Sequence, residues 1–127
     1  MSVQCPKCST AMEAVEFSGI TVERCVACKG IWFDGTAHRD LKKIKGSEAI
    51  DTGSAEVGKE FDKMTGVACP VCGVAMDRKP DTYQPHIHSD VCPVSHGVFF
   101  DAGEFRDFVK EDFGDFFRDL LVKNPKN

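Results

Sequence analysis

Seven cysteines are the residues whose type and spacing most clearly predict chemistry. The first four form two Cys-x-x-Cys pairs, Cys5 with Cys8 and Cys25 with Cys28, separated by sixteen residues. Each pair can bend the backbone into a knuckle, and two facing knuckles place four thiolates around one tetrahedral zinc ion. A redox dithiol or an iron–sulfur site is the alternative use of such a set. The spacing favours structural zinc, so we expect Cys25→Ser to unfold the N-terminal repeat.

The remaining three cysteines begin the same pattern without completing it. Cys92 is followed three residues later by Ser95, where the first set has a cysteine. A neutral hydroxyl is a poor zinc ligand, whereas His96 gives a Cys-x₃-His spacing that suits zinc. We therefore predict a second zinc ion on Cys69, Cys72, Cys92 and His96. The alternatives are a fourth ligand from His88 or His86, placed on one strand face, or a position left to water or without metal.

The similarity between the two halves extends beyond the ligands. Residues 29–34 align with 96–101, and Arg39-Asp40-Leu41 aligns with Arg106-Asp107-Phe108. The offset is 64 at the first knuckle and 67 from the second onward, which puts three extra residues near 80–85. Such self-similarity indicates two copies of one supersecondary unit.

The repeated motif resembles a known family. The pattern C-P-x-C, a hairpin, C-x-x-C-x-G-[IV]-W-[FL]-D and a helix is similar to the bacterial zinc ribbon family named for transcription factor IIB. The resemblance covers residues 4–46 and 68–109 and implies a zinc-ribbon fold. The family's Gly-Glu-Leu helix start survives as Gly103-Glu104-Phe105 in the second copy, whereas the first copy has Thr36-Ala37-His38.

The expected fold is a small, zinc-dependent α+β protein made of two tandem zinc ribbons. We predict the first ribbon at residues 1–46, a linker with a short helix at 47–66, and the second ribbon at 67–127. Strands are expected at 12–17, 20–24 and 30–33, and in the second copy near 74–79, 86–91 and 98–100. Helix 37–45 follows, capped by Thr36 or Asp34 and ended by Gly46. Repeats of about forty residues need their metal in order to fold.

A longer amphipathic helix is predicted at residues 102–122. Asp101 stands at the N-cap position and Glu104 three residues later, as in a capping box. Its apolar stripe is Phe105, Phe108, Val109, Phe113, Phe116, Phe117, Leu120 and Leu121. Five phenylalanines exceed what one ribbon can cover, so we expect packing against the first repeat around Ile31, Leu41 and Ile44, or a homodimer or partner surface.

Net charge bears on the class of partner. The chain carries 16 Lys and Arg against 20 Asp and Glu, a net charge of −4, which disfavours strong non-specific binding of nucleic acid. Residues 1–45 alone are slightly basic, with a small patch of Arg39, Lys42, Lys43 and Lys45. The sequence predicts no signal peptide and no membrane span, so we expect a cytoplasmic protein.

Three functions fit these observations. The favoured one is a non-enzymatic zinc ribbon that binds a protein partner or a second copy as an adaptor, in transcription or translation. The second is a nucleic-acid-binding ribbon that uses the basic patch. The third is a thiol or zinc enzyme with an open second site, although the sequence has neither an H-E-x-x-H pattern nor a deaminase H-x-E…P-C-x-x-C pattern.

Overall fold

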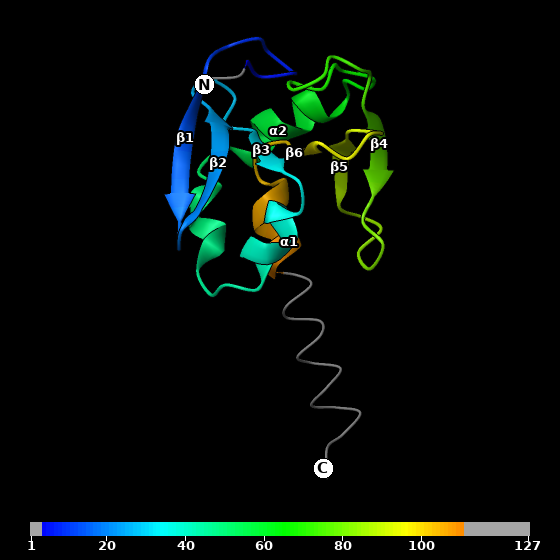
Figure 1. The fold of residues 1–127 in the computed structure, drawn as a ribbon. Helices are drawn as coiled ribbons and strands as arrows, with labels where there is room; N and C mark the ends of the chain where they lie inside the picture. The colour runs from blue at the N-terminus through cyan, green and yellow to red at the C-terminus, as the bar shows by residue number, and fades with distance from the viewer. Residues whose placement is uncertain (1–3, 111–127) are drawn as a thin grey trace.

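One antiparallel sheet runs through both repeats. The computed structural model describes residues 4–110, and these contain six strands in the order β1-β2-β3-β6-β5-β4 (Figure 1). The strand bounds are β1 (Met12–Phe17), β2 (Ile20–Cys25), β3 (Ile31–Asp34), β4 (Asp77–Pro80), β5 (His88–Val91) and β6 (Gly97–Phe100). The small α+β class with two ribbon-like halves is therefore confirmed.

The two repeats are related by an approximate twofold axis. Strands β3 and β6 pair across the middle of the sheet, with Ile31 opposite Phe100, Trp32 opposite Phe99 and Phe33 opposite Val98. With the offset of 67, only Trp32 and Phe99 are equivalent positions, and the symmetry exchanges the pairs Ile31–Phe100 and Phe33–Val98, so the axis passes through the Trp32–Phe99 pair. A single chain thus builds what two identical ribbons would build as a symmetric dimer.

Alternation along β3 and β6 sends side chains to two different cores. Trp32 and Phe99 lie with both cysteine groups and with Met12 and Met76 on one face, called here the metal face. The opposite face, the helix face, is the larger core, and Phe33 and Phe100 lie in it. Trp32 and Phe33 are both core residues, 1% and 0% exposed, and they point to the two different cores.

The first helix is shorter than the predicted 37–45. Helix α1 is Ala37–Lys42, and Thr36 stands at its N-cap without a side-chain hydrogen bond. The chain then turns at Gly46, whose φ of 88° is left-handed, and enters the 3₁₀ helix η1 (Ser47–Ile50). Strands β4 and β5 also begin later than expected, and His86 lies in the turn before β5 rather than on a strand beside His88.

The segment predicted as a linker packs against both repeats. It contains η1 and α2 (Ala55–Asp62), whose N-cap Ser54 accepts hydrogen bonds from the amides of Glu56 and Val57. At Gly58 an added Cβ would lie 2.0 Å from the Ala102 carbonyl oxygen, so α2 lies directly against the second repeat. Helix α2 therefore docks on the second repeat.

The helix after β6 begins differently from the expected capping box. Residues 104–110 are helical, and Asp51 from the connecting segment accepts hydrogen bonds from the amides of Gly103 and Arg106. The carboxylate of Asp101 points elsewhere, to Lys7 and Arg78. Capping thus comes from a residue fifty positions away, which local spacing cannot reveal.

The apolar stripe of this helix is covered by the chain where it is described. Phe105, Phe108 and Val109 are buried in the helix face together with Ile31 and Leu41, as expected for packing on the first repeat. The rest of the predicted stripe, Phe113, Phe116, Phe117, Leu120 and Leu121, lies outside the described residues. Within residues 4–110, none of the helices has the length and apolarity that crossing a bilayer needs.

Candidate metal centres

The first cysteine group is assembled by the β1–β2 hairpin and the two loops at its ends. Cys5 and Cys8 lie before β1, Cys25 ends β2, and Cys28 follows in the next turn. Their four sulfurs lie within 4.8 Å of one another, with Cys5–Cys28 at 3.6 Å and Cys8–Cys25 at 3.4 Å. A tetrahedron with zinc–sulfur bonds of about 2.3 Å places sulfurs about 3.8 Å apart. The group therefore has the size of a zinc site.

Backbone amides support these sulfurs as the knuckle geometry requires. The amide of Lys7 donates to the Cys5 sulfur at 3.4 Å, and those of Ala27 and Cys28 donate to the Cys25 sulfur at 3.3 Å. Such donors stabilise a thiolate over a thiol. The Cys28 thiol, hydrogen-bonded to Cys5, lowers the pKa of Cys5 to about 5, and the same contact raises the pKa of Cys28. A cation among the four sulfurs would displace the shared protons.

The second group brings three cysteines together with His96. Its four ligand atoms also lie within 4.8 Å of one another, and the Cys92 sulfur is 3.5 Å from Nδ1 of His96. Zinc–sulfur and zinc–nitrogen bonds of about 2.3 and 2.1 Å in a tetrahedron give a sulfur–nitrogen distance of about 3.6 Å. The two groups therefore fit two zinc ions, as expected. The alternatives, His86 and His88, are not in this group.

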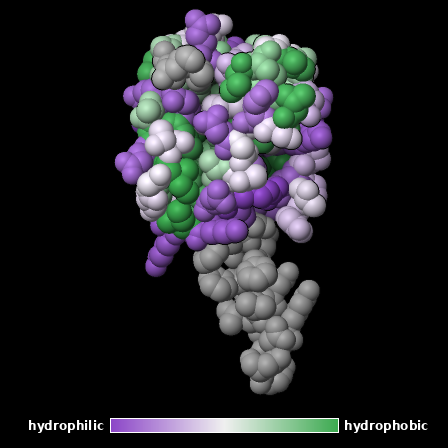
Figure 2. All heavy atoms as spheres, viewed as in Figure 1, coloured by the Kyte–Doolittle hydropathy of each residue, from purple (hydrophilic) through white to green (hydrophobic). Residues whose placement is uncertain are grey.

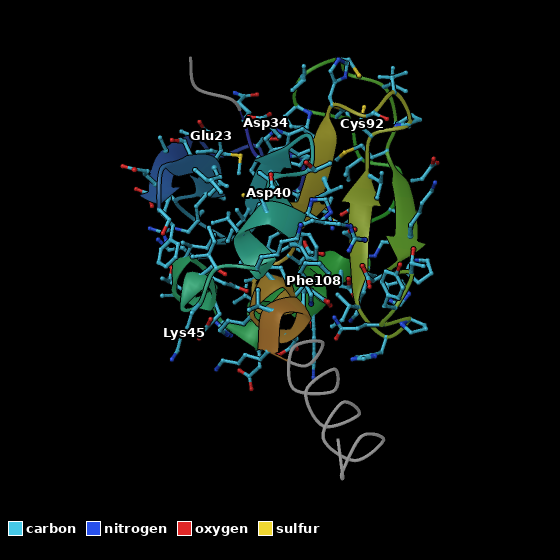
Figure 3. All side chains as sticks on the ribbon, turned by 60° about the horizontal axis from the view of Figure 1, so that its bottom comes forward. Glu23, Asp34, Asp40, Lys45, Cys92 and Phe108 are labelled. Atoms are coloured by element: carbon cyan, nitrogen blue, oxygen red, sulfur yellow. The ribbon has the colours of Figure 1, made fainter. Side chains whose placement is uncertain are left out.

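The two groups differ in how far they are covered. In the first, three ligands are buried and Cys8 is half-buried, whereas in the second Cys72 and His96 are exposed. Cys92 directly follows β5 and lies at the opposite end of the molecule from Phe108 (Figure 3). Because water reaches two of its ligands, the second site is the one from which a chelator should remove zinc first.

A buried charge cluster, which was not predicted from the sequence, connects the first knuckle to the second repeat. Lys7 extends its ammonium group to Asp101 at 3.0 Å and to Asp90 at 3.2 Å, and all three side chains are at most 1% exposed. Arg78 on β4 approaches the same two carboxylates, at 3.1 Å from Asp90 and 3.4 Å from Asp101. Burial raises the pKa of Asp101, although the charge of Lys7 opposes that shift.

In this cluster the two copies depart from symmetry. The position equivalent to Lys7 is Val71, which is exposed, and Asp34, equivalent to Asp101, accepts a hydrogen bond from the Trp32 indole. The only clue in the sequence is that the two copies differ at this knuckle position. Since Lys7 lies between two ligands of the first site, metal binding there positions a cation that the second repeat needs.

The glycines of the shared motif leave room for an aromatic ring of the neighbouring repeat. A Cβ on Gly30 would lie 2.3 Å from the Phe99 ring, and one on Gly97 would lie 2.7 Å from the Trp32 ring. Each ring thus lies over the glycine of the other repeat, in accordance with the twofold axis. The Gly-x-aromatic sequence of the motif serves the contact between repeats as well as the metal site.

Comparison with known proteins identifies the first repeat. Residues 4–45 match the model of a family described as transcription factor zinc-finger, which confirms the resemblance there. The first repeat is therefore a zinc ribbon of this family. The second repeat lies outside that match, and its likeness rests on the internal repeat and on its own ligand group. Searches of curated proteins and of solved structures give no significant match.

Proposed function

We propose that this zinc ribbon protein is a non-enzymatic adaptor that binds another protein, and that its two zinc ions hold the binding surface in shape. The observation that carries the proposal is an apolar patch on the second knuckle pair. Val71, Val74 and Val94 are 51%, 46% and 58% exposed and lie in the loops that carry Cys69, Cys72 and Cys92. Figure 2 shows one face of the molecule, on which hydrophobic residues lie among the polar ones. Exposed valines on metal-held loops suit a protein contact.

The ligand sets favour a structural role for zinc over a catalytic one. A catalytic zinc keeps one position for water or substrate, whereas structural sites have four protein ligands. His96 supplies a fourth ligand atom at the second group, where an open position would be needed for an enzyme.

Binding of nucleic acid is the second candidate, and two contacts count against it. The basic patch expected to contact phosphates is partly engaged within the chain, since Arg39 pairs with Asp81 at 3.0 Å. The ammonium of Lys42 donates to the Phe108 carbonyl and lies 4.0 Å from the centre of its ring. Lys43 and Lys45 remain exposed, which is a small surface for a polyanion in a chain of net charge −4.

Affinity capture with matched variants tests the adaptor. Zinc-loaded wild-type protein, Val71→Glu/Val94→Glu and the control Val57→Glu, which alters an exposed valine of α2, are immobilised and exposed to native lysate. We expect proteins that wild type and Val57→Glu retain and the double variant loses. A transcription protein among them would agree with the family description. The proposal is wrong if no protein depends on the knuckle valines and a nucleic-acid duplex instead binds with a steep salt dependence.

A further inference from the structure

The approximate symmetry allows the two outer sheet faces to be compared position by position. On β1 and β2 the helix face carries Val15, Phe17, Ile20 and Val22, which pack with the larger core. The chain that follows α1 returns over this face as η1, where Ile50 is 4% exposed in the same core. The Arg24 guanidinium donates to the Ile50 carbonyl at 2.9 Å, which fixes the segment on the strands. In the first repeat, therefore, a peptide segment covers the hairpin.

The equivalent face of the second repeat is hollow. The strand registers place Lys79 at the position of Val15 and Ser89 at that of Val22. A cavity of about 250 Å³ lies here, bordered by α1, β4, β5 and β6. Its apolar floor is formed by buried Ile87, Val98 and Phe100. Small-molecule sites occupy about 300–1,000 Å³, so this volume suits one large side chain better than a whole metabolite.

Polar groups around the floor specify what else the occupant needs. The cations Arg39 and Lys79 line the cavity, and Asp81 is paired with Arg39, so the charged lining is net positive. His38 also lines it, 9% exposed, and its Nδ1 has no hydrogen-bond partner among the described residues. Burial lowers the pKa of His38 to about 4, so the ring is neutral at pH 7. A neutral imidazole nitrogen can be satisfied by one hydrogen bond from a peptide group.

We propose that this cavity binds a short acidic segment of a partner protein, with one aliphatic or aromatic side chain on the apolar floor and a carboxylate beside Arg39 and Lys79. The segment would be the intermolecular counterpart of η1, whose own sequence, Ser-Glu-Ala-Ile, combines an acid with an apolar anchor. This inference rests on the proposed adaptor function and supplies a second contact surface for it.

The probe is the synthetic peptide Ser-Glu-Ala-Phe-Asp, which copies residues 47–51 with phenylalanine in place of isoleucine. It is titrated into the ¹⁵N-labelled, zinc-loaded full chain. We expect saturable shifts of the Ser89, Val91 and Val98 amides, and none with a peptide that has lysine at both acidic positions.

Two variants with matched controls locate the binding. Ser89→Trp fills the cavity and should weaken binding at least tenfold, whereas Thr21→Trp, on an exposed position of β2, should change it less than twofold. Lys79→Glu should weaken binding at least threefold, and Lys45→Glu should not. Retention of two zinc ions and a dispersed spectrum confirms that each variant is folded.

Several results would overturn the proposal. The first is the absence of amide shifts at millimolar peptide, and the second is a Ser89→Trp variant that binds the peptide as tightly as wild type does. The third is a wild-type dimer that Ser89→Trp dissociates, which would assign the cavity to a second copy of the chain. If the peptide shifts nothing and Ser89→Trp destabilises the free protein, the chain fills its own cavity. Val71→Glu/Val94→Glu should bind the peptide normally. If the peptide does not bind while capture of proteins still depends on Val71 and Val94, this inference is refuted and the adaptor function is not.

Discussion

Replacement of Lys7 by methionine should destabilise the whole protein without removing either metal. The substitution keeps most of the side-chain length and the backbone amide that donates to the Cys5 sulfur, and removes the buried ammonium together with its hydrogen bond to the Phe61 carbonyl. Asp90 and Asp101 would then keep only Arg78 as a cation partner in the cluster, at 3.1 and 3.4 Å, and Arg78 is also paired with Asp62. Breaking a buried ion pair on one side costs about 3–5 kcal/mol. A typical domain has only about 5–15 kcal/mol of unfolding free energy, so the loss would be large.

Equilibrium unfolding in urea, followed by the fluorescence of Trp32, the chain's single tryptophan, measures this loss. Lys45→Met, which changes an exposed lysine, is the matched control and should lie within about 0.5 kcal/mol of wild type. Both variants should retain two zinc ions per chain. A Lys7→Met protein as stable as the control would refute the claim that the cluster holds the repeats together.

A second substitution and a pH series test the electrostatic cause. Lys7→Met/Asp101→Asn should be more stable than Lys7→Met alone, because it removes one of the two uncompensated carboxylates. Burial already raises the pKa of Asp101, so the folded form takes up a proton more readily than the unfolded form. The stability deficit of Lys7→Met relative to wild type should therefore narrow as the pH falls toward the raised pKa of Asp101, and the double variant should show no such narrowing.

Three further outcomes are expected. Gly97→Ala should cost more than the roughly 1–3 kcal/mol of an overpacked core, since its Cβ would lie 2.2 Å from the Phe33 carbonyl; an unchanged melting temperature would contradict this. Burial lowers the pKa of His38 from 6.5 to about 4, so as the pH falls the unfolded chain binds the proton before the folded chain does. The folded state therefore becomes less stable as the pH falls from about 6.5 toward 4. Relative to His38→Leu, wild type should lose about 1.4 kcal/mol between pH 7.5 and 5.5, and parallel curves would count against it. Elemental analysis should find fewer than two zinc ions in His96→Ala and two in His88→Ala; the reverse result would move the fourth ligand.

The metal groups could be predicted from sequence because their information is local. Each Cys-x-x-Cys knuckle determines its own turn. The spacing of Cys92 and His96 predicted that both are ligands of one site, and the Cys92 sulfur lies 3.5 Å from Nδ1 of His96. The strands predicted at 12–17 and 20–24 are also local features, and β1 and β2 match those ranges to within one residue.

What the sequence could not reveal depends on contacts between distant residues. The alignment of the repeats identified Gly30 and Gly97 as equivalent, but not that each accommodates an aromatic ring of the other copy. Asp51 lies in a segment whose glycines and serines indicated a linker, yet it caps a helix fifty residues away. The burial of Lys7 could not be predicted from its neighbours in the knuckle, because its two acidic partners follow more than eighty residues later.

The most direct test of the central claim, that two zinc ribbons form one cooperative unit, is the ¹H–¹⁵N spectrum of Cys25→Ser. The sequence alone predicted loss of the N-terminal repeat. The shared sheet and the contacts of Lys7 predict more, namely that the amides of Val91 and Val98 in the second repeat also lose their native dispersion. Native shifts for those two amides, with one zinc ion retained on an intact second repeat, would contradict the account.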